Sequence, residues 1–350
     1  MYRKNTKVIK VGNKLIGGDN PIAVQSMTNT LTKDIDASIK QIKELEKARC
    51  DIVRMAITDI EDAKAIQEIK KHISIPIIAD IQYDYRLALE SIKYGVDGLR
   101  INPGNIGRFS KVEEIVNACK EKEISIRIGV NSGSIKKEFL DKYDGVNECS
   151  MVYSAMEQIN LLEELGFYDI KISLKASNVP LAIKSYSKMS ELCDYPLHLG
   201  ITEAGPSFRG IVKSSVGIGH LLATGIGDTI RISLTGDPVD EVKTGREILK
   251  SLGLLEEGLE IISCPTCART KIDLINIVNE AEDRLKNIDK HIKVAIMGCP
   301  VNGPGEAKEA DIGIAGGNGR GLIFRKGQIV KRVEEENLLD ELIKEIDKMD

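Results

Sequence analysis

The chain has 350 residues, 42% of them hydrophobic, which is enough for about two domains with cores of their own. Its 49 Lys and Arg nearly balance 53 Asp and Glu, and the net charge of −4 argues against nucleic acid or an anionic membrane as a partner. We find no apolar run of roughly 18 residues and no signal-peptide pattern, so we expect a cytoplasmic protein whose seven cysteines stay thiols or metal ligands.

In chain order, residues 6–18 predict a small hairpin that closes the bottom of the first domain. Short apolar runs, each followed by a stretch of helical period, then predict eight strands and eight helices. The strands are expected at 22–27, 51–56, 75–81, 98–102, 125–131, 169–176, 197–205 and 229–236. Apolar strands that alternate with helices form parallel sheets covered by those helices, so about eight units in roughly 250 residues predict an α/β fold, the (β/α)8 TIM barrel.

The eighth helix is expected over 240–253 and ends at Gly253. This predicts a TIM-barrel substrate-binding domain over 1–253 and a small α+β domain over 254–350. The second domain is expected to contain strands at 259–264, 293–298 and near 311–317, a hairpin within 321–333, and helices at 271–287 and 335–348. Its glycine-rich stretch 316–321 could cradle a phosphate, but no strand-to-helix context follows, which favours a simple turn.

Polar residues at the carboxyl ends of the strands form the active face of such a barrel. The residues in these positions are Arg54, Asp80, Arg100, Asn102, Arg127, Asn131, Lys175, Glu203, Arg231 and Ser233. Five of them are cations, and although a surface ion pair would explain any one, five around one mouth of a net-acidic protein predict a polyanionic ligand such as a diphosphate. Asp80 and Glu203 would then bind hydroxyl groups or transfer protons.

The cysteines fall into two groups. The isolated Cys50, Cys119, Cys149 and Cys193 are predicted to be small hydrophobic side chains without chemistry. Cys264 and Cys267 form a C-x2-C pair, and Cys299, which is followed by proline as Cys264 is, sits on a second sharp turn. Together they predict three thiolate ligands of one metal site.

The fourth ligand has two candidates. His291 would suit zinc, but it precedes a predicted strand and should lie at the end away from Cys299. Glu306 follows the turn that holds Cys299, and a carboxylate on one iron of a [4Fe-4S] cluster would be replaceable by substrate in a way that thiolate is not. The local sequence alone slightly favours Glu306 as an ordinary helix-start or solvated turn residue.

Several long motifs carry a resemblance to a known family. They include "LRINPGNIG", "RIGVNSGS", "LGITEAG", "SCPTCART" and "MGCPVNGPGE", and the match extends over almost the whole chain. The sequence resembles the 4-hydroxy-3-methylbut-2-enyl diphosphate synthase family, in its compact bacterial form. This resemblance implies a [4Fe-4S] cluster held by Cys264, Cys267, Cys299 and Glu306, and it implies that the ten strand-end residues named above contact the substrate.

The implied reaction is the two-electron reductive ring opening of 2-C-methyl-D-erythritol 2,4-cyclodiphosphate, with loss of water, to 4-hydroxy-3-methylbut-2-enyl diphosphate. Glu203, Asp80 and Glu306 are the implied catalytic residues, and flavodoxin or ferredoxin is the implied electron donor. The family further implies a homodimer in which each cluster domain caps the partner's barrel. One departure is Gln82, which stands where the family has histidine and removes a proton-transfer role from that position.

Two other classes of function remain alternatives. The first is a metal-independent phosphosugar aldolase or isomerase with Lys175 as a Schiff base and a structural zinc in the C-terminal domain, which would be colourless. The second is an electron carrier or cluster scaffold, for which five cations around a barrel mouth would have no use. Visible absorption that dithionite bleaches under anaerobic conditions would distinguish the iron-sulfur enzyme from the aldolase.

Overall fold

The computed structural model describes residues 3–286, 288, 290–300 and 309–349. It divides the chain into two compact units, Met1–Leu255 and Glu256–Asp350. The sequence placed this boundary between 253 and 254. No helix among the described residues is long and apolar enough to cross a membrane.

The first unit is an eight-stranded parallel sheet that closes on itself, which confirms the predicted TIM barrel. The sheet order is β8-β7-β6-β5-β4-β3-β10-β9, and a parallel bridge between Ile172 and Leu197 joins the two ends of that order. The strands are β3 (Ala23–Met27), β4 (Ile52–Ala56), β5 (Ile77–Asp80), β6 (Gly98–Ile101), β7 (Ser125–Asn131), β8 (Ile170–Lys175), β9 (His198–Leu199) and β10 (Thr229–Ile230).

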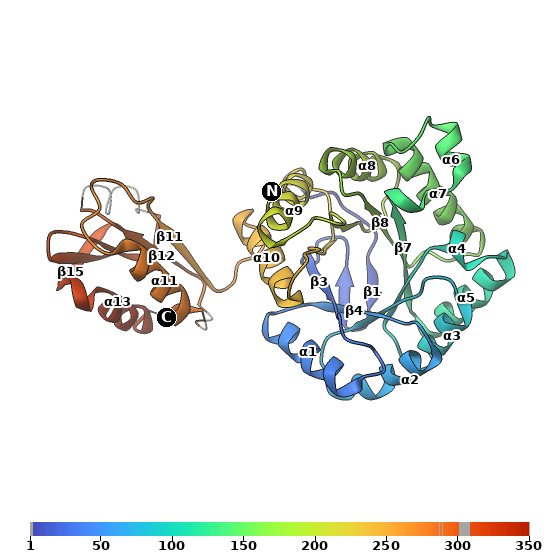
Figure 1. The fold of residues 1–350 in the computed structure, drawn as a ribbon, viewed down its shortest axis with the longest axis horizontal. Helices are drawn as coiled ribbons and strands as arrows, with labels where there is room; N and C mark the ends of the chain where they lie inside the picture. The colour runs from blue at the N-terminus through green and yellow to red at the C-terminus, as the bar shows by residue number, and fades with distance from the viewer. Residues whose placement is uncertain (1–2, 287, 289, 301–308, 350) are drawn as a thin grey trace. The chain divides into compact units, whose positions relative to one another are not determined.

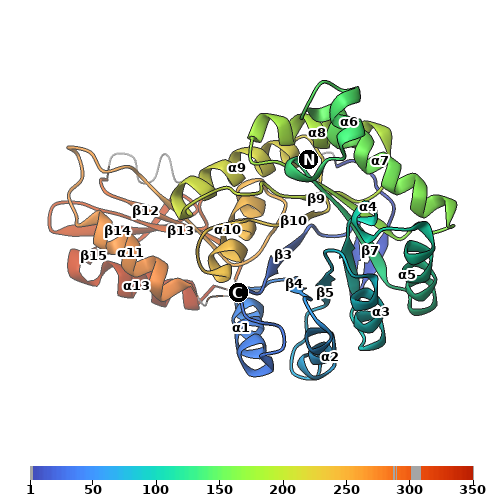
Figure 2. The ribbon, with the colours of Figure 1, turned by 45° about the vertical axis from the view of Figure 1, so that its right-hand side comes forward.

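Helices surround these strands and cover the outer face of the sheet (Figure 1). The longer ones are α1 (Ile35–Lys47), α2 (Ile60–Ile69), α3 (Tyr85–Lys93), α5 (Phe109–Lys122), α7 (Glu148–Glu164), α8 (Val179–Leu192), α9 (Ser207–Ala223) and α10 (Pro238–Ser251). Two short helices, α4 (Pro103–Ile106) and α6 (Lys137–Lys142), follow β6 and β7. Figure 2 shows α1, α2, α3 and α5 standing outside the strands of the barrel. Their buried faces carry the apolar residues of the main core, because helical periodicity gathers those residues on one side.

The predicted N-terminal hairpin is present as β1 (Ile9–Val11) and β2 (Lys14–Ile16). Its apolar residues form a small core of their own with Ala23, Ile52 and Ile78. Because these three residues lie at or near the first positions of β3, β4 and β5, the hairpin closes the amino-terminal end of the barrel. The carboxyl ends of the strands are therefore the ends that remain for a ligand.

The last two barrel strands are much shorter than predicted. The sequence indicated strands over 197–205 and 229–236, whereas β9 and β10 contain only His198–Leu199 and Thr229–Ile230. After β9 the chain turns at Glu203, whose φ is +51°, and at Gly205, whose φ is +106°. Left-handed backbone interrupts an extended strand, so the apolar pattern alone overestimated its length.

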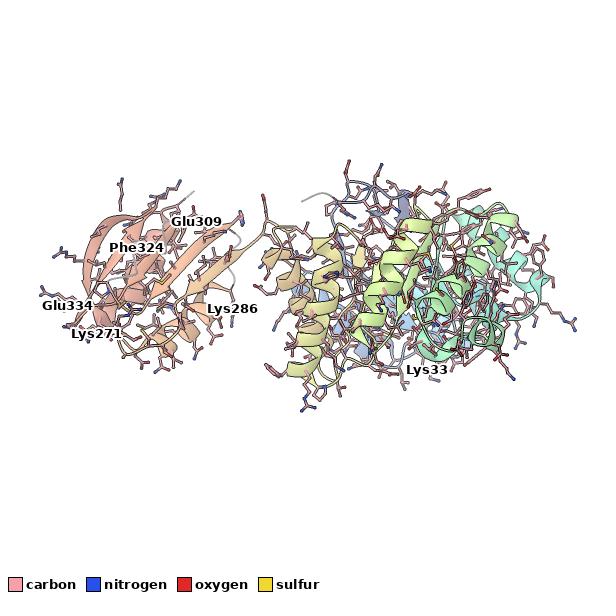
Figure 3. The ribbon with its side chains drawn as sticks, turned by 90° about the horizontal axis from the view of Figure 1, so that it is seen from above. Lys33, Lys271, Lys286, Glu309, Phe324 and Glu334 are labelled. Carbon is pink, nitrogen blue, oxygen red and sulfur yellow. The ribbon has the colours of Figure 1, made fainter. Side chains whose placement is uncertain are left out.

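In its described residues, the second unit is a five-stranded mixed sheet covered by two longer helices, as the predicted small α+β domain requires. The strands β11 (Leu259–Ser263), β12 (Ile292–Met297) and β13 (Ile312–Ala315) are parallel, and β14 (Arg320–Arg325) and β15 (Gln328–Glu334) continue the sheet as an antiparallel hairpin. The helices α11 (Leu274–Leu285) and α13 (Leu338–Asp347) bury their apolar faces against the sheet. Phe324 of β14, labelled in Figure 3, belongs to a second small apolar cluster with Ala295 and Met297.

Candidate functional site

A small basic cavity lies at the carboxyl ends of the barrel strands. Its volume is about 190 Å³. One water molecule takes about 30 Å³ in the liquid, so the cavity is about six times that volume. The residues that line it are Arg54, Asp80, Gln82, Arg100, Arg127, Asn131, Ser173, Lys175, Thr202, Arg231 and Ser233. All five of the predicted strand-end cations are therefore brought to one cavity.

The register of the parallel strands explains this convergence. Asp80 on β5 pairs with Arg100 on β6, and Arg100 pairs with Arg127 on β7. Neighbouring strands lie about 4.8 Å apart and paired residues point to the same face of the sheet. Three charged side chains thus stand side by side on the inner surface of the barrel.

Asp80 is the carboxylate that these arginines share. Its Oδ1 accepts a hydrogen bond from Nη1 of Arg100 at 3.1 Å, and its Oδ2 lies 3.6 Å from Nε of Arg54. Burial raises the pKa of Asp80, but the charges of Arg54, Arg100 and Arg127 outweigh burial and hold that pKa below its usual value. Asp80 is therefore ionised at neutral pH and accepts hydrogen bonds.

Arg54 contacts Met27 as well as Asp80. Its Nη2 and Nε lie 2.8 and 3.1 Å from Sδ of Met27, and the same Nε is the atom that faces Oδ2 of Asp80. Burial lowers the pKa of Arg54 to about 9, although Asp80 opposes this shift. A pKa of this size leaves the guanidinium charged at neutral pH.

A second carboxylate, Glu241 of α10, supports the opposite side of the cavity. Its Oε2 lies 3.6 Å from Nη2 of Arg231 and accepts a hydrogen bond from Oγ of Ser26 at 3.1 Å. The sequence analysis did not identify Glu241, because the residue is in a helix and its acidic side chain resembles an ordinary helix-start residue. Only the packing of α10 against β3 reveals its role.

The cavity has more positive than negative charge. Five cations line it, and the carboxylates that pair with them are Asp80 and Glu241. Within the described residues, Nε of Arg100, Nε and Nη1 of Arg127 and Nε of Arg231 are buried without a hydrogen-bond partner. Unpaired buried donors and excess positive charge favour binding of an anion with several oxygen atoms.

Lys175 contributes the fifth cation from β8. Burial lowers its pKa well below the usual value, and the charges of Arg127 and Arg231 lower it further. An ideal Cβ at Gly200 would lie 2.8 Å from Nζ of Lys175, so the absence of a side chain on Gly200 makes room for the ammonium group. A bound anion would reverse the effect of the neighbouring cations and favour the charged form.

Two predicted residues lie outside the lining of the cavity. Asn102 is buried and caps α4, where its Oδ1 accepts a hydrogen bond from the backbone N–H of Gly104 at 3.1 Å. Glu203 lies in the turn after β9. Conversely, Ser173 and Thr202 line the cavity although the sequence analysis passed over them. Ser173 could have been found, because it alternates with Lys175 on one strand and shares its face.

Gln82 lines the cavity at the position where histidine was expected. Its Oε1 accepts a hydrogen bond from Nη1 of Arg100 at 3.4 Å. A neutral amide cannot exchange a proton near neutral pH, but it can orient this guanidinium.

The cysteines of the second unit lie at the carboxyl ends of two adjacent parallel strands. Cys264 follows β11 and Cys299 follows β12, and the backbone N–H of Gly298 donates a hydrogen bond to Sγ of Cys264 at 3.2 Å. The loop that carries Cys267 is held close by, because the N–H of Lys271 bonds the carbonyl of Gly298 at 2.9 Å.

Cys267 is exposed, and its pKa is lowered by hydrogen bonds from the backbone and then the side chain of Arg269. Thiols that lie close to N–H donors fit an iron-sulfur cluster, whose sulfur ligands accept such bonds. In the part of the chain that the structure describes, however, no three His, Cys, Asp or Glu side chains gather closely enough to hold a metal ion. Glu306 lies outside the described residues.

The remaining residues that the sequence singled out, which are a possible zinc ligand, the isolated cysteines and the glycine-rich stretch, lie away from Cys264 and Cys299 or have structural roles. His291 immediately precedes β12 while Cys299 follows it, and a strand of this length separates them by roughly 20 Å. Cys50 and Cys119 are buried among apolar residues, and burial raises the pKa of both thiols, that of Cys50 to about 12. The glycine-rich stretch 316–321 forms the turn between β13 and β14 and then the start of β14, as its sequence favoured.

Comparison with known proteins gives matches for both units. Residues 6–246 match the family model described as the GcpE TIM-barrel domain, and residues 260–348 match that of the GcpE protein C-terminal domain. The chain is 62% identical over 347 residues, 99% of its length and 98% of the relative's, to "4-hydroxy-3-methylbut-2-en-1-yl diphosphate synthase (flavodoxin)" of Caldanaerobacter subterraneus subsp. tengcongensis. It is 61% identical, over 99% of both chains, to the protein of the same name from Clostridium perfringens.

Among solved structures, dihydropteroate synthase of Yersinia pestis superimposes with a TM-score of 0.51 at 10% identity, covering 70% of this chain and 97% of that one. At this level of identity the likeness concerns the barrel fold alone.

Proposed function

The chain belongs to the GcpE family, and on this premise we propose that its basic cavity binds a cyclic diphosphate while Cys264, Cys267, Cys299 and Glu306 hold a [4Fe-4S] cluster. The chain is an oxidoreductase of the methylerythritol phosphate pathway to isoprenoids. It converts 2-C-methyl-D-erythritol 2,4-cyclodiphosphate to 4-hydroxy-3-methylbut-2-enyl diphosphate with two electrons, two protons and release of water. The alternative of a metal-independent aldolase or isomerase with a zinc tail is not supported by these relatives.

The observation that carries the site assignment is the excess of cations in the cavity. Arg54, Arg100, Arg127, Lys175 and Arg231 bind the two phosphate groups, with Asn131 and Ser233 as further hydrogen-bond partners. Asp80 and Glu241 already position Arg54, Arg100 and Arg231, so little ordering of these three side chains remains when the ligand arrives. The cap on α4 engages Oδ1 of Asn102 and does not use its Nδ2, which can donate a hydrogen bond to the ligand.

The carboxylates have different roles in this proposal. Asp80 is ionised and partly committed to two arginines, so it positions the cations and accepts a hydrogen bond from a substrate hydroxyl. It cannot supply a proton. Glu203, in the turn after β9, is the carboxyl group that transfers a proton to the departing oxygen.

When bound, the [4Fe-4S] cluster supplies electrons one at a time and a Lewis-acidic iron at the ligand position of Glu306. Cys264, Cys267 and Cys299 anchor it, and the N–H of Gly298 stabilises the thiolate of Cys264. A flavodoxin-type carrier delivers the electrons, in keeping with the name of the relatives. We expect the enzyme to act in the cytoplasm, a reducing compartment that keeps its cysteines as ligands or free thiols.

We further propose that the active species is a homodimer in which each cluster domain serves the partner's barrel. The cation cavity and the cysteines belong to different units connected by the segment 252–258, and the reaction needs both. Helix α9 supports association with a second copy, because Phe208, Val212 and Val216 are exposed on one side of it at helical spacing, Phe208 by 80%.

A mixing experiment tests this assembly. Chains with Cys264→Ala should be inactive, chains with Arg100→Met should turn over little at substrate concentrations near the native KM, and mixed dimers assayed at those concentrations should regain activity. One of the two sites in each mixed dimer receives an intact barrel and an intact cluster domain, so about a quarter of native activity is expected after full exchange. Turnover that stays at the level of the parent variants, in samples that sedimentation shows to be mixed dimers, would favour capping within one chain.

The cluster itself is tested by anaerobic purification. Native protein should be coloured, contain about four iron atoms per chain, lose visible absorption with dithionite, and turn over the cyclic diphosphate. Cys299→Ser should lose iron and turnover together, whereas the matched control Cys193→Ala, at the end of α8, should keep both. A colourless native protein with full turnover would overturn the proposal.

A further inference from the structure

A buried lysine lies beneath the basic cavity and has no part in the mechanism above. Lys171 precedes Ser173 and Lys175 on β8, and alternate residues of a strand point to the same face. Ser173 and Lys175 line the cavity, so Lys171 faces the barrel interior about 7 Å further along the strand. Only 1% of its surface is exposed.

The ammonium nitrogen of Lys171 has no hydrogen-bond partner among the described residues. Directly across from Lys171, on β7, stands Arg127, and the two residues are paired in register. Lys171 is thus a buried basic side chain next to Arg127, whose guanidinium group lines the cavity. A charged ammonium in this place would repel Arg127 and lack a counter-ion.

Asp228 is the carboxylate whose charge raises the pKa of Lys171, but both of its oxygens already accept hydrogen bonds from other groups. Oδ1 of Asp228 accepts hydrogen bonds from Nη2 of Arg3 and Oγ1 of Thr6, both at 2.8 Å. Its Oδ2 accepts a hydrogen bond from the backbone N–H of Leu197, also at 2.8 Å. Asp228 therefore compensates Arg3 and orders the N-terminal segment, which leaves little of its charge for Lys171.

The remaining groups around Lys171 are neutral or cationic. His198 on β9 has its Nδ1 within 2.8 Å of Oγ1 of Thr229, and burial holds the pKa of His198 well below its usual value. Lys175 is the next basic side chain on the same face of β8, and burial lowers its pKa well below the usual value as well. The pKa of Lys171 is lowered to about 7, first by burial and then by the charge of Arg127, against the opposing charge of Asp228.

We propose that Lys171 is neutral while the cavity is empty and takes up a proton when the cyclic diphosphate binds, so that it acts as a positioning residue that adjusts the charge beneath the substrate. The inference rests on the proposed diphosphate site. The ligand brings two negative charges to Arg127, which cancels the repulsion that kept Lys171 neutral and adds attraction for an ammonium group. The proton comes from solvent and no covalent bond in the protein changes.

The sign of the pH dependence follows from this uptake. The pKa of Lys171 is higher in the complex than in the free enzyme, so binding is strongest below about pH 7 and weakens as the pH rises from the free value to the bound value. One proton per ligand corresponds to at most a tenfold loss of affinity per pH unit in that range. A cyclic diphosphate has no ionisation of its own there, so the slope reports groups of the protein, and comparison of Lys171→Met with Lys175→Met separates the contributions of the two lysines.

Calorimetry measures the uptake directly. The holoenzyme is titrated with the cyclic diphosphate, without electron donor, at about pH 8 in two buffers of different ionisation heat. Native enzyme should take up protons on binding, and Lys171→Met should take up close to one proton fewer and show a flatter dependence of Kd on pH. The control Lys184→Met, an exposed position on α8, should match native enzyme.

The outcomes separate this inference from the site on which it rests. Binding without proton uptake in native enzyme would overturn the inference, as would equal uptake in Lys171→Met with loss of uptake in Lys175→Met. Absence of binding to native enzyme would instead overturn the diphosphate site, and the inference with it. If Lys171→Met does not fold, Lys171→Gln and the native measurement decide the question, since only a titrating amine produces the pH slope.

Discussion

Glu306→Cys should keep its colour and iron content and lose turnover by about a hundredfold or more, which corresponds to about 2.7 kcal/mol in the barrier. In our proposal Glu306 supplies an exchangeable oxygen ligand, and a fourth thiolate would bind iron more firmly and keep that position closed. Because the barrel cations are untouched, the dissociation constant of the cyclic diphosphate should stay within a few-fold of native. Glu306 lies outside the described residues, so this expectation comes from the motif that follows Cys299.

The measurements are anaerobic turnover with dithionite and a viologen, iron content, and substrate affinity. Glu309, a described residue after the same turn, provides the matched control: Glu309→Cys should retain turnover. Near-native turnover in fully loaded Glu306→Cys enzyme would refute the exchangeable-ligand role. Loss of iron from that variant would contradict the expected firmer binding of iron by a thiolate at this position.

Arg100→Met should weaken binding of the cyclic diphosphate roughly ten- to hundredfold, since a charged hydrogen bond contributes about 1.5–3 kcal/mol. Arg100 donates to Asp80 and Gln82 through Nη1, while its buried Nε has no hydrogen-bond partner among the residues that the structure describes and remains for the ligand. The thermal midpoint should change little, because Asp80 keeps its contact with Arg54. Unchanged affinity, measured by calorimetry without electron donor, would remove Arg100 from the site.

Gly129→Ala gives an independent test of the same guanidinium. An ideal Cβ at this position would lie 2.8 Å from Nε of Arg100, so the added methyl group must displace the side chain without removing its charge. Affinity should fall several-fold. In the control Gly219→Ala the methyl group would meet no atom within 4 Å, and affinity should remain native. If both variants bind the cyclic diphosphate with native affinity, the position of the Arg100 guanidinium does not affect substrate binding.

Much of the fold could be predicted because its signals are local. Apolar runs such as 125–131 and 169–176 alternate with helical stretches, and the structure confirms β7 and β8 within those limits. The prediction failed at 197–205, where the apolar letters continue but Glu203 adopts a left-handed conformation. Pairing with neighbouring strands, which a single segment does not specify, decides where such a strand ends.

The candidate site, like the fold, contains residues that the sequence could identify and others that only the structure reveals. A TIM barrel exposes the carboxyl ends of its strands, so Arg54, Arg100 and Arg231 could be listed as mouth residues from their place after apolar runs. The sequence could not identify Glu241, which reaches Arg231 from α10, or Met27, which contacts Arg54 from the neighbouring strand. Both depend on packing between elements that are distant in sequence.

By itself, the sequence determined the barrel, the second domain, the family and the residue types of the site, because periodicity and motif spacing are properties of short segments. Only the tertiary structure decided which charges are compensated. It engages Asp228 with Arg3 and Thr6 and shares Asp80 between two arginines. It also leaves Lys171 beside Arg127 with no hydrogen-bond partner in the described part of the chain. Charge compensation depends on distance and burial, which the register of eight strands creates and no single strand contains.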